Sequence, residues 1–95
     1  MNTFNFSLVE GVLKDDPEVY SLDACTQYCE FKIVNDQGVF DIVTLKELAD
    51  TCMKYLKKGS RVMVGGKLRK DEDLMNTFIE GKEVNFLPSK PVEVT

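Results

Sequence analysis

The sequence predicts an all-β fold, a five-stranded Greek-key barrel with one α-helix between strands 3 and 4. Three observations support this prediction: short β-prone segments recur along the 95 residues, several carry a glycine in mid-strand, and one amphipathic helix interrupts them. A chain of this length forms a single domain. We expect that domain to span residues 1–87, followed by a flexible C-terminal end at residues 88–95, which holds two prolines.

The first expected strand spans residues 5–13 and is apolar on both faces. Gly11 in its middle indicates a bend. The pair Asp16-Pro17 ends the strand, because proline lacks an N–H donor and restricts the residue before it. An apolar outer face is typical of a surface that contacts another subunit. The outer face of this strand carries Phe6, Leu8 and Val12.

The next segments are predicted to form a hairpin. Residues 18–22 can return as a short strand, and residues 26–34 then alternate between the two faces of a sheet. A turn at residues 35–38 leads into a strand at residues 39–44. The residues expected in the core are Cys29, Phe31, Ile33, Phe40 and Ile42, and those expected outside are Tyr28, Glu30 and Lys32.

A helix is predicted after this hairpin. Thr44-Leu45-Lys46-Glu47 has the T-x-x-E form of a capping box, in which the threonine hydroxyl and the glutamate carboxylate each bond a free backbone N–H. Acidic residues near the start and lysines near the end match the helix dipole, and Gly59 is the expected C-cap. The apolar stripe that should face the core consists of Leu45, Leu48, Ala49, Cys52 and Leu56.

Two further strands complete the pattern, at residues 61–70 and at residues 77–87, the second interrupted at Gly81. Between them, residues 71–73 are read as an acidic loop. In the first of these strands the inward residues are Val62, Val64, Gly66 and Leu68, and the outward residues are Arg61, Met63, Gly65, Lys67 and Arg69. The resulting β-β-β-α-β-β order favours the OB-fold over an SH3-like barrel or an open α+β sandwich, since neither alternative explains the helix position as directly.

The composition excludes several classes of function. No apolar run is long enough to span a membrane, and the N-terminus lacks the pattern of a signal peptide, so we expect the protein in the cytoplasm. Because there is no histidine, no phosphate-binding loop and no nucleophile with an evident base, we expect no enzyme, no cofactor and no metal. The cysteines Cys25, Cys29 and Cys52 are expected to be reduced and buried as small hydrophobes.

Five motifs, in order, resemble the bacterial single-stranded DNA-binding proteins. That family shows an opening N-x-V-x-L-x-G-x-L-x-x-D-P-E pattern, then K-L-A-E, a helix ending in Y-L-x-K-G-S-x-V, a strand reading E-G-x-L-R and a final V-x-F-L. The matching residues are Asn5–Leu13 with Asp16–Glu18, Glu47–Asp50, Tyr55–Val62, Gly65–Arg69 and Val84–Leu87. The resemblance implies an OB-fold and a non-catalytic, sequence-tolerant single-stranded DNA-binding protein in replication, recombination or repair. Most matched residues also bend a strand, cap a helix or fill a core, so the resemblance supports the fold more strongly than the function.

The chain departs from the family where DNA would be gripped. Relatives stack bases on exposed aromatic side chains, each worth about 1–3 kcal/mol. The corresponding positions here hold Val39 and Leu45, the short turn at residues 35–38 and the acidic residues 71–73, and the sequence has no tryptophan. The acidic tail of the family is not found after Pro91. We therefore expect a short, divergent member that lacks the tail and the usual stacking aromatics and binds DNA weakly.

The formal net charge of −4 disfavours nucleic acid unless the basic side chains share one face. Lys67 and Arg69 share a parity, so they can follow phosphates along one groove. The aromatic residues Phe4, Tyr20 and Phe78 are interpreted as core or interface residues. The predicted nucleic-acid-binding residues are Lys32, Lys67, Arg69, Lys70, Tyr28 and Met63.

Two alternatives stay open. For any one of these cations, a solvated strand face is an equally good interpretation. For the whole chain, the alternative function is an OB-fold protein–protein interaction module with weak or no nucleic-acid binding, which the acidic balance and the missing aromatics favour. The resemblance also implies a homodimer or homotetramer, with no membrane and no small-molecule substrate as partner. The predicted oligomer interface is the outer face made by Phe6, Leu8 and Val12.

Overall fold

The computed structural model describes residues 4–21, 23–71 and 76–88, and its elements follow the predicted order. The predicted flexible end lies outside these residues from position 89 onward, as do positions 72–75 of the segment after the fifth strand. Residues 18–21 do form the short strand that the sequence suggested. The elements are β1 Ser7–Leu13, β2 Glu18–Ser21, β3 Gln27–Asn35, β4 Gly38–Leu45, α1 Lys46–Tyr55, β5 Arg61–Asp71 and β6 Asn76–Leu87.

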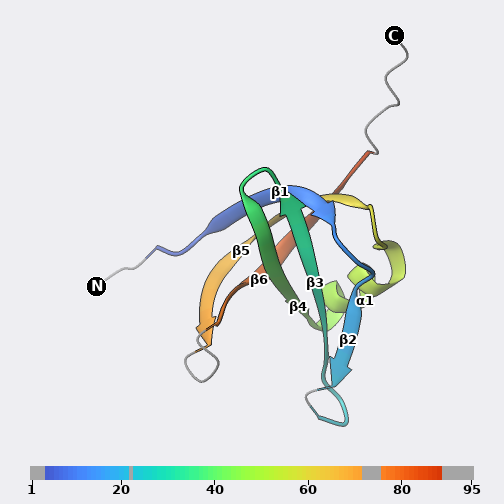
Figure 1. Ribbon diagram of the computed structural model, residues 1–95. Helices are drawn as coiled ribbons and strands as arrows, with labels where there is room; N and C mark the ends of the chain where they lie inside the picture. The colour runs from blue at the N-terminus through green and yellow to red at the C-terminus, as the bar shows by residue number, and fades with distance from the viewer. Residues whose placement is uncertain (1–3, 22, 72–75, 89–95) are drawn as a thin grey trace.

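Five of the six strands close into a barrel (Figure 1). β1 pairs with β5 along most of its length and with β3 at its end, β5 pairs with β6, and β3 pairs with β4, all antiparallel. A parallel pairing of β4 with β6 completes the ring. β2 pairs with β3 and extends the sheet outside the ring. The predicted OB-fold, a five-stranded Greek-key barrel with a helix before its fourth strand, is therefore confirmed.

The core is built by the inward residues of the five barrel strands and by one face of α1, which packs against β3, β4 and β6. Each buried aliphatic or aromatic side chain contributes about 1.5–3 kcal/mol through the removal of apolar surface from water. The inward parities predicted for β3, for β4 and for the first half of β5 are confirmed. The buried core residues are Leu13, Cys29, Phe31, Ile33, Ile42, Ala49, Cys52, Leu56, Val62, Val64 and Ile79.

The bend predicted at Gly11 lies where β1 leaves one partner strand for another. Val12 pairs with Arg61 of β5 and also with Val34 of β3. A side chain at Gly11 would bring a Cβ atom within 2.7 Å of the Val34 carbonyl oxygen, far inside van der Waals contact. Only glycine allows the two backbones to approach this closely, and the approach closes the barrel.

The predicted capping box is wrong. Thr44 belongs to β4, where the period of two turns its side chain inward, and its buried hydroxyl donates a hydrogen bond of 3.4 Å to the Cys29 carbonyl oxygen. The N-cap of α1 is Leu45, without a side-chain cap, and Lys46 begins the helix with a φ of 57°. The predicted C-cap is wrong as well, because α1 ends before Leu56 and Gly59 lies in the following turn.

Three smaller predictions are also corrected. Leu68 follows the inward parity of β5, but its side chain is 48% exposed because the pairing with β1 ends at Gly66. Cys25 is exposed, whereas the other two cysteines are buried as expected. β6 is not interrupted at Gly81 but runs on through a β-bulge, in which Lys82 is the extra residue.

Candidate nucleic-acid interface

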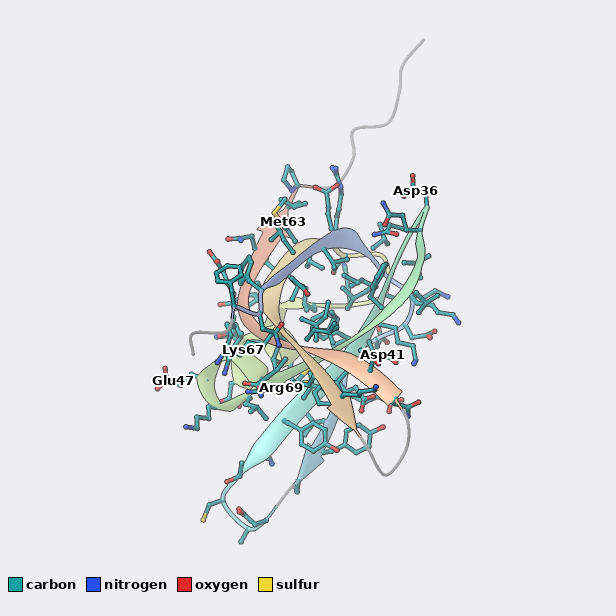
Figure 2. All side chains as sticks on the ribbon, turned by 90° about the vertical axis from the view of Figure 1, so that its left-hand side faces the viewer. Asp36, Asp41, Glu47, Met63, Lys67 and Arg69 are labelled. Atoms are coloured by element: carbon teal, nitrogen blue, oxygen red, sulfur yellow. The ribbon has the colours of Figure 1, made fainter. Side chains whose placement is uncertain are left out.

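Lys67 and Arg69 lie together on the outer face of β5, as their shared parity predicted (Figure 2). Their cross-strand neighbours on β6 are Glu80 and Phe78. Arg69 Nε donates to the Glu80 carboxylate at 3.0 Å, and Lys82 pairs with the same carboxylate. These hydrogen bonds, first that from Lys82, hold the pKa of Glu80 below its usual range. Arg69 and Lys82 therefore share one carboxylate, which offsets one of their two positive charges.

Lys32 lies on the outer face of β3, as predicted, but its ammonium group also has a carboxylate partner. Its Nζ donates to the carboxylate of Asp41 on β4 at 2.6 Å, and the two residues are direct cross-strand neighbours. This hydrogen bond raises the pKa of the Lys32 ammonium above its usual value. A phosphate that approached Lys32 would have to compete with the Asp41 carboxylate.

The register places three carboxylates, a valine and a lysine along one line of cross-strand neighbours that runs over five strands. Glu18 lies directly opposite Glu30, and further along the line Glu80 lies opposite Lys67. Like charges in direct opposition are unfavourable, and the adjacent carboxylates of Glu18 and Glu30 repel phosphates. Among the described residues neither Lys67 nor Lys70 has an ion pair. The residues in the line are Glu18, Glu30, Val43, Glu80 and Lys67.

Tyr28 stacks on Tyr20, which the sequence analysis interpreted as a core or interface residue. Their ring centroids are 5.3 Å apart with an interplanar angle of 24°, because the β2–β3 register sets the two residues opposite each other. Tyr20 is 40% exposed, so it is not a core residue. Its hydroxyl donates to the Glu18 carboxylate, which raises the pKa of Tyr20 to about 12. The sequence alone could not predict this stacked pair, because the contact between the two rings depends on the exact β2–β3 register across the turn before β3.

Met63 does not join the other predicted residues. Its cross-strand neighbours are Glu10 and Asn85, on a different part of the barrel surface from those of Lys67 and Arg69 (Figure 2). Lys70 is exposed near the end of β5, next in sequence to Arg69. The structure thus brings Lys67 and Arg69 to one face of β5, whereas Lys70 has the opposite parity on that strand and Met63 lies apart from both.

A hollow of about 420 Å³ opens beside this region, between β1, β4, β5 and β6. Val39, one of the positions where the sequence resemblance led us to expect a stacking aromatic, lines it. Two phenylalanines, Phe40 and Phe78, also line it, so the hollow offers aromatic surface from other positions. Asp41 at its rim carries the charge that is paired with Lys32.

The predicted oligomer face is exposed in the single chain. Phe6, Leu8 and Val12 expose 52%, 60% and 41% of their surface. The Phe6 ring and a Leu8 methyl lie over Gly65 of β5, within 2.9 and 3.5 Å of where its Cβ would be. Phe4, interpreted from sequence as core or interface, is 93% exposed and is not in the core.

In the described part of the chain, no group of three acidic or cysteine side chains is arranged to hold a metal ion. No helix of that part is long and apolar enough to cross a membrane.

No protein-family model and no curated protein matches the chain, but solved structures do. The single-stranded DNA binding protein from Thermus aquaticus matches with a TM-score of 0.83 at 22% identity, over 97% of this chain and 44% of that one. A deletion mutant of that protein matches with a TM-score of 0.81 at 24% identity, over 96% of this chain and 45% of the mutant chain. The SSB domain of a Synechococcus protein matches with a TM-score of 0.78 at 14% identity, over 88% of this chain and 97% of that domain.

This chain spans less than half the length of the Thermus aquaticus protein and nearly all of the Synechococcus domain. At these identities the likeness is one of fold, and it extends over almost every described element. The resemblance that the sequence motifs indicated is thereby confirmed in three dimensions: the chain is an OB-fold barrel similar in structure to bacterial single-stranded DNA-binding proteins.

Proposed function

We propose that this protein binds single-stranded DNA, without catalysis and without sequence preference, in replication, recombination or repair in the cytoplasm. The observation that carries the proposal is the likeness to the Thermus aquaticus protein over 97% of the chain. The exposed cations Lys67, Arg69 and Lys70 on one part of β5 support it, because they suit a phosphate backbone. Tyr28 and Lys32 on β3 extend the proposed contact surface, whereas Met63 is removed from it.

The electrostatics of the face predict weak binding. Lys32 and Arg69 already pair with carboxylates, so Lys67 and Lys70 are the cations most available to phosphates. Two phosphate contacts on a single strand give a slope of about −1.4 when the logarithm of the association constant is plotted against that of the salt concentration. A family member with several free cations and stacking aromatics would show a steeper slope and tighter binding.

Fluorescence anisotropy with labelled oligo-dT at low salt tests the proposal. We expect binding in the micromolar range, and we expect that changing Lys67 and Arg69 together to glutamate abolishes it. Lys57→Glu is the matched control, since Lys57 is an exposed lysine in the connection before β5, whereas Lys67 and Arg69 lie near the other end of that strand. Absence of binding at tens of micromolar protein would refute the proposal.

We also propose self-association, as a homodimer or homotetramer, through the face of Phe6, Leu8 and Val12. Burial of three large exposed apolar side chains would supply the driving force. Leu8→Asp should shift the mass measured by light scattering to that of a monomer. A monomer mass for the unaltered protein at high concentration would defeat this proposal.

One alternative function has an observation of its own. If the paired cations leave too little free positive charge for DNA, the barrel is better described as a protein–protein interaction module. The adjacent carboxylates of Glu18 and Glu30 on the outer face favour this alternative. A pull-down that recovers only nucleic acid, with the Leu8→Asp variant behaving as the parent does, would exclude it.

A further inference from the structure

β2 is a free edge of the sheet. In the part of the chain that the structure describes, β2 pairs with β3 alone, and all four of its residues are exposed. Figure 1 shows no strand beyond it. The N–H and C=O groups on the outer side of such a strand lack ladder partners, and an extended peptide can supply them. Natural edges are often protected by lysines or prolines; β2 itself reads Glu-Val-Tyr-Ser and contains neither, and Pro17 lies just before it.

The surroundings of this edge are strongly acidic. A hollow of about 170 Å³ beside β2 is lined by four carboxylates and one ammonium, and that ammonium, on Lys32, is already paired with Asp41. Glu18 and Glu30 face each other across the β2–β3 pair at the centre of this surface. The four carboxylates belong to Asp15, Asp16, Glu18 and Glu30.

An aromatic surface completes the edge. Tyr20 stacks on Tyr28 with one face of its ring, and its hydroxyl is held by Glu18. Because β2 is the outermost strand of the sheet among the described residues, no strand of that part of the chain covers the side of Tyr20 away from Tyr28. A tyrosine face next to carboxylates attracts a guanidinium or ammonium group through both cation–π and ionic contacts. A phosphate at the same place would meet two glutamates.

We propose that the free edge of β2 binds an extended basic peptide segment of a partner protein, with arginine or lysine at alternate positions. Side chains of an added strand point alternately to the two faces, so every second one would lie beside Glu18 and Tyr20. The intervening side chains would lie beside Val19, an exposed apolar side chain on the opposite face that favours an apolar neighbour. The predicted ligand therefore alternates basic and apolar residues. This inference does not depend on DNA binding.

A labelled octapeptide of alternating arginine and valine is the probe, with anisotropy measured at low ionic strength. We expect the peptide to bind and a version with glutamate in place of arginine not to bind. Tyr20→Leu should weaken binding about threefold, as an exposed cation–π contact would. Glu18→Gln combined with Glu30→Gln should weaken it about fivefold. Glu83→Gln, an exposed carboxylate on β6, is the matched control and should change nothing.

Peptide N-methylation tests strand pairing without altering the protein. Methylating the backbone nitrogens of one alternate set of residues removes the donors that face β2, and methylating the other set does not. We expect one methylated peptide to lose binding and the other to keep it. Equal behaviour of the two, or equal binding of the glutamate peptide, would overturn the proposal.

Two other occupants would be recognised in the same experiments. If Tyr20→Leu reduced the affinity for oligo-dT while the basic peptide did not bind, the edge would serve nucleic acid and the proposal would be wrong. If Tyr20→Leu converted a dimer to a monomer in sedimentation, the edge would serve a second copy of the chain, and the proposal would again be wrong.

Discussion

Gly66→Ala should be among the most damaging small substitutions in this barrel. A Cβ at this position would lie 2.1 Å from the Glu80 carbonyl oxygen, 2.9 Å from the Glu80 carbonyl carbon and 3.0 Å from the Gly81 Cα. All three atoms belong to the backbone of β6, so no side chain can rotate out of the way. The two strands would have to separate by more than about 1 Å at the bulge, in the middle of the β5–β6 ladder.

Overpacking of this kind costs about 3 kcal/mol or more, because relief requires a backbone shift and lost hydrogen bonds. For a domain of this size, that loss lowers the melting temperature by about 12–24 °C.

Gly65→Ala is a matched control one residue away. Its nearest atom is Phe6 Cζ at 2.9 Å, the tip of an exposed ring that can move aside. We expect Gly65→Ala to change the free energy of unfolding by less than about 1 kcal/mol.

Urea unfolding followed by circular dichroism measures both variants, and an unchanged m-value would show that the denatured states are comparable. If Gly66→Ala were within about 0.5 kcal/mol of Gly65→Ala, the close approach of the two backbones would not limit this position and the reasoning would fail.

Three further predictions concern single contacts. Asn5→Ala should lower the free energy of unfolding by about 1–2 kcal/mol in urea, because the Asn5 amide both donates to and accepts from the Leu68 main chain, at 2.9 and 3.0 Å; an Asn5→Asp variant as stable as the parent would contradict the role of the donor. The Tyr20 pKa is raised from 10.0 to about 12, so its protonated phenol favours the folded state below about pH 10 and loses this effect as pH rises through 12; ultraviolet titration of Glu18→Gln should show the pKa return toward 10. Cys25 alone should react with a thiol reagent in the folded protein, because burial raises the pKa of the other two thiols, that of Cys29 to about 11; three reactive thiols without denaturant would contradict the described burial.

Sequence patterns predicted the barrel because its core depends on short-range periodicity. The alternation in β3 and the apolar stripe of α1 each follow from the spacing of residues within one element. The capping box failed for the same kind of reason. Thr44 has the local sequence of a helix cap, but the alternation of β4 continues through it and directs its hydroxyl to Cys29 in the core. Tertiary burial decided between two local preferences that the sequence expresses equally well.

The candidate site was predicted less completely, because its electrostatics depend on contacts between distant parts of the chain. The parity of β5 correctly placed Lys67 and Arg69 on one outer face. Their partner Glu80 comes from β6, and the register between the two strands cannot be read from either strand alone. The pairing of Tyr20 with Tyr28 depends in the same way on the register across a turn.

The bulge in β6 connects the core with the charge of the outer face. Ile79 and Val84 both turn toward the core although they are five residues apart, which strict alternation forbids. The extra residue, Lys82, resets the parity between them and is itself left outside, where it pairs with Glu80. The irregularity that lets both halves of β6 fill the core therefore also places a lysine where it competes with Arg69 for one carboxylate. Loss of Lys82 charge should tighten the Arg69–Glu80 pair and leave still less free positive charge for phosphates on this face.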